Sequence, residues 1–527
     1  MSNSVNKLIN DAKSYFNKGD YKNALITCDA ILKIDTNHID ALNMTAIILM
    51  QSKKFEVAII ILNKLISLSK KNSIYYYNRA LAYRGLNNLE KSQENYELSI
   101  KQDPNSIPSI INLGNLFQEQ ERHEEAIIQY KKAIMINPND EKIYNNLGLS
   151  YFKMHLYENS LEEYRKAIII NPRYEEAIFG LGNSYDMIGN PGEAMKEFDR
   201  VIAINPNHAR AFFNLAQIQL SLGNFMDGWK NYGWRFKEEI TRESVLADVN
   251  IPLWDQSKKI LNILVIAEQG IGDQILFYSL LNELLDFNFN VTVIIEHKLL
   301  SLFQRSMPKI QFIERGIKID EAEFDAYIPM CDLGKMFRKE LSDFEKVRSH
   351  YLTADYKKIK KIKFKMSKNK LKCGISWKSN NAIMGKGKSF ELEFLEPLLK
   401  NQNIQFINLQ YGDVNHDLSH IKNKYQTDIL DTSDIDNYED MEGLAALIDS
   451  CDIIVTSSNS NAHLAGALGK ETYLILPKAS SLIWYWEHKM DKISQWYKSI
   501  NIFNQAMTNQ WEDPISKITK TIEKKYL

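Results

Sequence analysis

The segment AEQGIGD, residues 267–273, carries the residues with the clearest potential for chemistry. It follows the apolar run ILVI and precedes a helical stretch. Short apolar runs of this kind are typical of parallel sheets, whose ligands bind beyond the carboxyl ends of the strands. Gly270 and Gly272 permit a tight turn, so we expect the acid Asp273 to be exposed to a cleft at this end of the sheet. The simpler interpretation is a turn capped by Asp273, with Glu268 as a solvated acid.

A second polar cluster follows the apolar run DIIV in the segment SSNSNAHLAGALG, residues 457–469. Its serines and asparagines crowd the start of an expected helix, where free N–H groups and the helix dipole favour a phosphate. His463 would lie in the first turn and donate to that anion or to a sugar hydroxyl. A serine-rich helix cap with an incidental histidine is equally open. The dinucleotide fingerprint GxGxxG is incomplete, because its third glycine would fall on Ile275, and this disfavours hydride chemistry.

A long repeat precedes the elements that must position these residues. Prolines recur every 34 residues at Pro104, Pro138, Pro172 and Pro206, and two series of small residues keep the same period. Small residues let paired helices approach closely, and a proline can start a helix because it needs no N–H partner there. The period and the segment YNNLGLSYFKMHLYENSLEEYRKAIIINP are typical of tetratricopeptide repeats. Residues 1–235 are therefore predicted to form six to seven repeats in an α-solenoid, a superhelix with a concave groove.

The predicted groove makes a protein or peptide the expected partner of the repeats. The side chains that could line it are Tyr75, Tyr76, Tyr77, Asn145 and Asn146. The same residues could equally serve packing or lie on the surface.

Two α/β units are expected beyond a linker at residues 236–259. Strand-like runs such as NILVI, VTVIIEH and DAYIPM alternate with helical stretches in residues 260–356, and LKCGISW, NIQFINLQ and ETYLILP do so in residues 372–505. This alternation indicates parallel sheets covered on both faces, and hence two Rossmann-like halves facing a cleft. A lysine-rich linker at residues 357–371 joins them, and a C-terminal helix is expected at residues 506–527. The lysines favour a solvated helix and linker over a patch for acidic partners or an anionic membrane surface.

Composition narrows the class of protein. The 527 residues are 44% hydrophobic and 25% charged, with a formal net charge of −1, which argues against a general nucleic-acid binder. The four cysteines are far apart and form no zinc or disulfide pattern, which fits reduced thiols. The N-terminal segment lacks a signal-peptide core, and no stretch is apolar enough to span a membrane. We therefore expect a cytoplasmic protein.

Four segments resemble a known family: NFMDGWKNYGWRF, IPLWDQSKKILNILVIAEQGIGDQILFYSLL, GLAALIDSCDIIVTSSNSNAHLAGALGKETYLILP and SQWYKSINIFNQ. They resemble bacterial tetratricopeptide-repeat glycosyltransferases, whose catalytic region is similar to the heptosyltransferases. The layout is also similar to that of the protein O-GlcNAc transferases. The resemblance implies a GT-B fold of two Rossmann-like domains. It further implies metal-independent, inverting transfer from a nucleotide sugar, which is a substrate, with no cofactor.

Site residues carry over from this resemblance position by position. The family's glycine–aspartate turn falls on Gly272 and Asp273, so Asp273 is the implied base, and Glu268 is the alternative base. The acceptor side is formed by Glu268, Gln269, Gly270 and Gly272. The resemblance implies Lys388, Ser389 and His463 as donor-binding residues. Strand ends and the start of the second helix add Lys378, Gln410, Ser458, Asn459, Ser460 and Asn461. Gln410 would contact the base or ribose, or else be a buried amide satisfied by the backbone. Lys388 stands where an arginine is more usual, and lysine lacks the bidentate fork of arginine.

Two departures from the family pattern bear on the donor. The family usually reads VDTSVAHLAGALG, whereas Ser458 and Asn459 replace its aspartate and threonine here. The arginines usual near a later tryptophan motif are absent, and Trp484, Trp486 and His488 stand there instead. Three hypotheses follow. The favoured one is a protein glycosyltransferase that modifies Ser or Thr of a protein held by the repeats. The others are a transferase with a saccharide acceptor, and a protein-binding scaffold with an inactive transferase domain.

Overall fold

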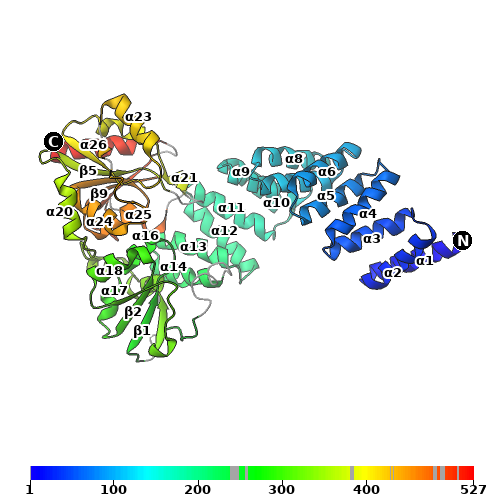
Figure 1. Ribbon diagram of the computed structural model, residues 1–527, viewed down its shortest axis with the longest axis horizontal. Coiled ribbons are helices and arrows are strands. Elements are labelled where there is room, and N and C mark those ends of the chain that lie inside the picture. Colours follow the sequence, from blue (N-terminus) through cyan, green and yellow to red (C-terminus); the bar gives the residue numbers. More distant parts are fainter. Residues whose placement is uncertain are drawn as a thin grey trace. The chain divides into compact units, whose positions relative to one another are not determined.

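A computed structural model describes residues 2–237, 249–255, 259–379, 385–427, 429–430, 432–478, 483–486, 493–506 and 510–527. The chain forms two compact units, Met1–Ser184 and Tyr185–Leu527. The division falls within helix α11 (Glu175–Met187), so the last helices of the repeat region belong with the α/β region (Figure 1).

Antiparallel helix hairpins build the first unit. Its helices are α1 (Ser2–Asn17), α2 (Tyr21–Ile34), α3 (Ile39–Gln51), α4 (Phe55–Leu68), α5 (Ser73–Gly85), α6 (Leu89–Gln102), α7 (Ile107–Glu119), α8 (His123–Ile136), α9 (Glu141–Lys153), α10 (Tyr157–Ile170) and the start of α11. The small residues do what the period predicts. A Cβ on Gly114 would lie 2.8 Å from the Tyr130 ring, and one on Gly148 would lie 3.0 Å from the Tyr164 ring. The chain therefore contains a tetratricopeptide-type helical solenoid.

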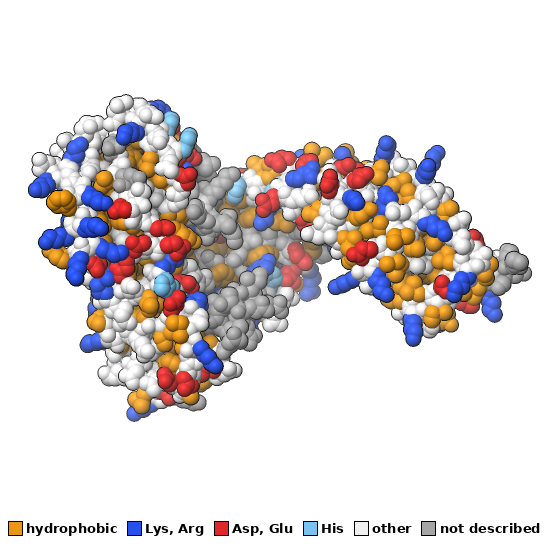
Figure 2. Space-filling view, viewed as in Figure 1, with side chains coloured by type: hydrophobic (Ala, Val, Ile, Leu, Met, Phe, Trp, Pro, Cys, Tyr) orange, Lys and Arg blue, Asp and Glu red, His pale blue; other side chains and the backbone are white. Residues whose placement is uncertain are grey.

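The periodic prolines have a different role from the one predicted. Helix α6 ends at Gln102 with Asp103 as its C-cap, and Pro104 follows in the turn before α7. Proline cannot continue a helix, so it ends one hairpin helix instead of starting the next. Two of the predicted groove tyrosines, Tyr75 and Tyr76, are buried and serve packing. Apolar side chains nevertheless lie among charged ones on the face of this unit seen in Figure 2.

The second unit begins with helices of the same kind. They are α12 (Pro191–Ile204), α13 (Ala209–Ser221), α14 (Phe225–Tyr232) and the short 3₁₀ helix η1 (Gly233–Lys237). Helices α13 and α14 pack as a hairpin, and we call α13, α14 and η1 together the last hairpin.

The first α/β half is a four-stranded parallel sheet. Its strands are β1 (Asn262–Ile266), β2 (Asn290–Ile295), β3 (Gln311–Glu314) and β4 (Ala326–Pro329), in the order β3-β2-β1-β4. Its helices include α16 (Ile271–Tyr278), α17 (Leu281–Leu285), α18 (Leu300–Ser306) and α19 (Leu333–Phe337). Helix α16 begins directly beyond the carboxyl end of β1, which is where a parallel sheet positions its ligand-binding groups.

The second α/β half is a six-stranded parallel sheet. Its strands are β5 (Leu371–Ser376), β6 (Ile404–Asn408), β7 (Ile429–Leu430), β8 (Ile453–Ser457), β9 (Glu471–Leu476) and β10 (Ile500–Asn504), in the order β10-β9-β8-β5-β6-β7. Its helices are α20 (Tyr356–Phe364), α21 (Gly385–Lys388), α22 (Glu396–Leu399), α23 (Asn415–Tyr425), α24 (Met441–Ser450), α25 (Ser460–Ala467) and α26 (Glu512–Tyr526). The lysine-rich segment forms α20, and Lys358 and Lys365 pair with Asp440 and Asp434.

One apolar core runs through the last hairpin, the first half, and helices α24 and α25 of the second half. The two halves also share polar contacts, because the N–H groups of Tyr351 and Leu352 both donate to the carbonyl of Ala467 in α25. Arg305 of α18 forms a bidentate ion pair with Glu442 of α24. These contacts hold helices α16 and α25 together. Of the predicted site residues, Gly272 and Asp273 lie on α16, and Ser460, Asn461 and His463 lie on α25.

Candidate functional site

The turn after β1 has an unusual backbone. Gln269 adopts a φ of +64°, which is uncommon for a residue with a side chain, and Gly270 then forms the N-cap of α16. Such residues persist where surrounding contacts fix them, and they cluster at functional sites. The first turn of α16 carries Gly272 and Asp273.

Asp273 is partly buried, and its burial raises the pKa of its carboxyl group to about 6. The N–H of Gly270 and the nearby Lys388 act in the opposite direction, because both favour the charged form. An acid with such a pKa is mostly ionised at neutral pH but binds a proton readily. This is the behaviour required of a general base.

Helix α25 packs directly on this turn. A Cβ on Gly272 would lie 2.7 Å from Cδ2 and 3.0 Å from Nε2 of His463, so only glycine lets the two helices meet. The fold thus brings together the turn around Asp273 and the helix that bears His463, although they are 190 positions apart in the chain. This juxtaposition lies beyond the carboxyl ends of β1 and β8.

His463 lies between the hydroxyl groups of two tyrosines. The histidine is buried, its Nδ1 lies 2.8 Å from the hydroxyl of Tyr497, and its Nε2 lies 3.2 Å from that of Tyr485. Burial, and then the nearby charge of Lys388, lower the pKa of its imidazole to about 3, so the ring is neutral. Both ring nitrogens thus have partners within the protein, and the expected hydrogen bond from His463 to an anion stays a prediction. The ring instead supports the turn at Gly272.

Lys388 lies at the end of α21, beyond β5, and its side chain is only 3% exposed. Burial lowers the pKa of its amine to about 8, while Asp273 raises it. Among the described residues, none forms a hydrogen bond or an ion pair with its ammonium. A buried cation without a partner is costly, and an anionic ligand would relieve that cost. The adjacent Ser389 binds the backbone: its hydroxyl donates to the carbonyl of Gly385 and accepts from the N–H of Ser379.

Gln410 and Asn459, two of the predicted donor-binding residues, form hydrogen bonds within the protein. The side-chain oxygen of Gln410 accepts from the N–H groups of Trp377 and Lys378 and from the hydroxyl of Ser376. The amide of Gln410 is therefore satisfied by its surroundings, as the alternative interpretation held, and is not free for a base or ribose. Asn459 caps α25, with its oxygen accepting from the N–H of Asn461 and its amide donating to the hydroxyl of Ser376 and the carbonyl of Lys378.

The remaining polar residues near α25 are also engaged. Ser458 accepts a hydrogen bond from the indole N–H of Trp486 at 2.9 Å. Asn461 is fully buried, and its amide N–H donates to the carbonyl of Leu409, whereas its side-chain oxygen has no hydrogen-bond partner among the described residues. The N–H of Ala462 donates to the carbonyl of Asn459, so the start of α25 offers fewer free donors than predicted. Ser460, the first residue of the helix, stays partly exposed.

Two other predicted site residues, Lys378 and Glu268, form ion pairs within the protein. Lys378 pairs with Asp417 at 2.6 Å, so its charge is already balanced. Glu268 is 1% exposed and forms a bidentate ion pair with Arg235, at 2.6 and 3.2 Å. Its interpretation as a solvated acid is therefore wrong, because both carboxylate oxygens are buried and accept from the guanidinium of Arg235. Its role as an alternative base stays a prediction. His488 lies outside the described residues.

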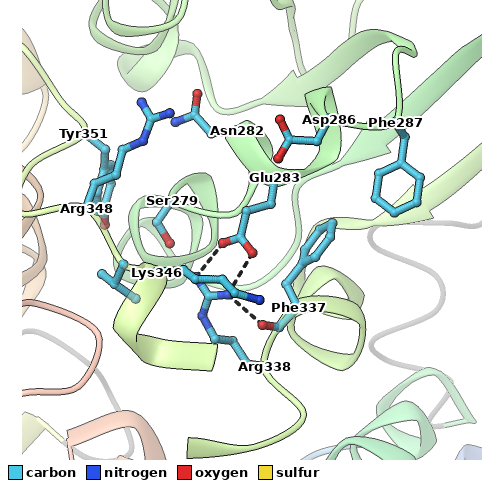
Figure 3. Close-up of a pocket in the computed structure, with 11 residues that line it drawn as sticks. Ser279, Asn282, Glu283, Asp286, Phe287, Phe337, Arg338, Lys346, Arg348 and Tyr351 are labelled. Carbon is cyan, nitrogen blue, oxygen red and sulfur yellow. Dashed lines mark hydrogen bonds and ion pairs between the residues drawn. The ribbon is translucent and has the colours of Figure 1, made fainter. Parts of the chain in front are cut away.

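Sequence reasoning missed Arg235, Tyr485 and Tyr497, which contact predicted site residues. Arg235 lies in the motif GWRF, where a lone arginine among aromatic residues was the available signal. A separate pocket of about 480 Å³ lies beside α17 and is lined by Glu283, Arg338 and other residues, none of them a predicted site residue (Figure 3). Of the residues described, no three or more His, Cys, Asp and Glu side chains are grouped to hold a metal ion. None of the described helices is both long and apolar enough to cross a membrane.

Comparison with known proteins identifies the repeats. Five family models match: tetratricopeptide repeats at residues 74–106, 141–174, 176–208 and 197–230, and a TPR repeat at residues 114–154. The chain therefore contains tetratricopeptide repeats, which are typical of protein-interaction scaffolds. It is 24% identical over 324 residues to Protein FlbA of Caulobacter vibrioides, a match that covers 58% of this chain and 53% of that protein. The chain thus spans about half the length of the curated relative that it matches.

Solved structures of repeat proteins are similar to part of the chain. A tetratricopeptide repeat protein from Parabacteroides merdae is 19% identical, with a TM-score of 0.37, and the match covers 46% of this chain and 97% of that one. YrrB, described as a TPR protein with an unusual peptide-binding site, is 22% identical, with a TM-score of 0.31, covering 34% and 94%. The MamA protein is 21% identical, with a TM-score of 0.31, covering 33% and 94%.

Proposed function

We propose that the chain is a glycosyltransferase that moves a sugar from a nucleotide-sugar donor to a hydroxyl group, with Ser or Thr of a bound protein as the acceptor. The observation that best supports this is the combination of Asp273 and Lys388. An acid with a raised pKa and a buried cation without a partner lie close enough to influence one another's pKa, beyond the strands of two parallel sheets. A displacement with an anionic leaving group requires one group of each kind.

In the proposed reaction Asp273 accepts the proton of the acceptor hydroxyl as its oxygen attacks the anomeric carbon. The bond between that carbon and the donor phosphate oxygen breaks, and the electron pair leaves with the nucleoside phosphate. Lys388 stabilises the negative charge that develops there, since a cation in a low-dielectric site interacts strongly with it. Attack opposite the leaving group inverts the configuration at the carbon. The GT-B architecture is part of the same proposal, which the two parallel α/β halves support.

The tetratricopeptide repeats support a protein acceptor, since such arrays bind polypeptides. A saccharide acceptor is the alternative within the same chemistry, with the repeats recruiting other proteins. A second candidate function, a binding scaffold with an inactive α/β region, is favoured by one observation. Hydrogen bonds to other groups of the protein already engage the side chains of His463, Gln410 and Asn459.

The decisive experiment measures donor binding by calorimetry and nucleotide release across a broad panel of nucleotide sugars, including sialic-acid-type donors. The wild type is compared with Asp273→Asn and with Asp286→Asn, which changes an exposed acid of the same half. We expect donor binding by all three proteins and turnover by the wild type and Asp286→Asn alone. If no donor binds, the scaffold is the correct function. If Asp273→Asn turns over normally, Asp273 is not the base.

A second experiment separates the two acceptor classes. Alanine at Tyr77 or Asn145, two half-buried side chains of the repeats, should reduce modification of an acceptor protein while donor hydrolysis stays unchanged. Unchanged modification by both variants would favour the saccharide acceptor.

A further inference from the structure

Arg235 is the only cation that contacts Glu268 among the described residues, and it comes from the last hairpin of the repeat region. Its side chain is 2% exposed. The guanidinium lies 3.9 Å from the centre of the Phe236 ring and 4.6 Å from that of Tyr232, and it donates to the carbonyl of Tyr232. The group is therefore fixed on all sides before it meets its acidic partners.

Those partners both belong to the first α/β half. Arg235 donates to the two carboxylate oxygens of Glu268, at 2.6 and 3.2 Å, and to Asp332 at 2.6 Å. Glu268 also accepts from the N–H of Cys331 at 3.2 Å. The clamp, as we call Arg235 with Glu268 and Asp332, joins the last hairpin to the carboxyl ends of β1 and β4. Planar bidentate geometry of this kind fixes orientation as well as contributing energy.

Glu268 anchors the turn that carries Asp273. Between them lie Gln269, at an unfavourable positive φ, and the N-cap Gly270. A strained residue keeps its conformation only when its neighbours are held in place. The clamp holds one end of this turn, and the contact of Gly272 with His463 holds the other.

The same hairpin also reaches the histidine side of the site. The indole N–H of Trp229 in α14 donates to the carbonyl of Arg338 at 2.7 Å, and its ring is 5.4 Å from that of Trp484. Trp484 packs against Tyr485, whose hydroxyl bonds His463. The last hairpin therefore contacts supports of both the turn and helix α25.

We infer that Arg235 is a positioning residue for the site, so that the last hairpin of the repeat region is a working part of the catalytic apparatus. The expected effect of Arg235 on turnover rests on the proposed function. The expected effect of Arg235 on the conformation of the turn does not depend on that function. Displacing a reacting group by about 1 Å can cost about a hundredfold in rate, so loss of the clamp should be visible in kcat.

The chain offers a matched control for substituting Arg235. Arg338 of the first α/β half is 1% exposed and forms a bidentate ion pair with Glu283, at 2.7 and 3.1 Å. Glu283 lies on α17, so this ion pair does not contact the turn around Asp273 (Figure 3). Arg235→Met and Arg338→Met should both lower the melting temperature. Only Arg235→Met should lower kcat, by tenfold or more, with less than a threefold change in the donor KM. Arg235→Lys keeps the positive charge but loses the two parallel N–H donors of the guanidinium, so it too should lower kcat. This variant replaces Arg235→Met in the experiment if the methionine variant does not fold.

Hydrogen exchange followed by mass spectrometry gives a readout that needs no activity. Peptides covering residues 263–277 should exchange faster in the Arg235 variants than in the wild type, and should be unchanged in Arg338→Met. Equal kcat values for the Arg235 and Arg338 variants, or equal exchange at the turn, would overturn the inference. A wild type that turns over no donor would refute the proposed function, while the exchange result would still decide whether Arg235 holds the turn.

Discussion

The pH dependence of turnover is the sharpest consequence of the Asp273–Lys388 pair. Asp273 must be ionised to accept a proton, and its pKa is raised to about 6. Lys388 must be protonated to stabilise the leaving group, and its pKa is lowered to about 8. The two requirements overlap only between these values, so kcat/KM should follow a bell-shaped profile centred near pH 7.

The depth of the bell follows from the two pKa values. At pH 7 about 80% of the molecules carry the ionised acid together with the charged amine, whereas at pH 5 or pH 9 about 9% do. We therefore expect kcat/KM to fall about ninefold on each side of the optimum. An acid with the ordinary pKa of an exposed aspartate would instead give a flat profile between pH 5 and pH 7.

The assay is nucleotide release from the best donor between pH 4.5 and 9.5, at constant ionic strength. Lys388→Met should remove the alkaline limb. It should also move the acid limb upward, because the ammonium lowers the pKa of Asp273. A profile that is flat from pH 5 to pH 7, or an acid limb that moves downward in Lys388→Met, would refute the reasoning.

Three further predictions concern stability and reactivity. Folding raises the pKa of Asp273, so the folded state binds its proton more tightly than the unfolded state does, and ionisation of Asp273 lowers the stability of the wild type. Asp273→Asn cannot ionise, so it should be more stable than the wild type by up to about 3 kcal/mol above pH 6. Thermal unfolding should show no difference between the two proteins below pH 4. Gly272→Ala should lose about 1–3 kcal/mol in denaturant titrations, because its Cβ would meet the buried His463 ring at 2.7 Å, whereas Gly270→Ala meets only a carboxylate oxygen of Asp273 at 3.5 Å and should be nearly neutral. All four cysteines are buried, so mass spectrometry should find no alkylation by iodoacetamide in the native protein and complete alkylation in denaturant; rapid alkylation of native thiols would contradict the packing.

Much of the fold could be read from local patterns. The 34-residue period predicted the helical hairpins, because a glycine such as Gly114 and a large ring such as Tyr130 must recur together for each pair to pack. The apolar runs predicted the parallel strands, since strands buried on both faces carry continuous apolar residues. A short repeat or strand depends on its own residues, and these are visible in the sequence.

The site could be predicted only in part. The sequence predicted Asp273, Gly272, Lys388 and His463 as site residues, and the fold brings these four together. It could not indicate how each polar group is satisfied, because that depends on residues far away in the chain. Glu268 was expected to be solvated, but it is buried in an ion pair with Arg235, which lies 33 positions earlier in the chain. The orientation of His463 likewise depends on hydroxyl groups that no motif specifies.

The clamp also limits how the protein can be divided. A boundary after residue 235 looks natural in the sequence, since the repeat pattern fades there. A fragment that starts beyond it would keep Glu268 and Asp332 and lose the cation that lies between them. Glu268 is buried, and a buried carboxylate without a counter-charge costs several kcal/mol, so that fragment should be insoluble or poorly folded. A fragment that starts at Tyr185 retains Arg235. Repeats should therefore be exchangeable between related proteins only where they lie before Tyr185 in the chain.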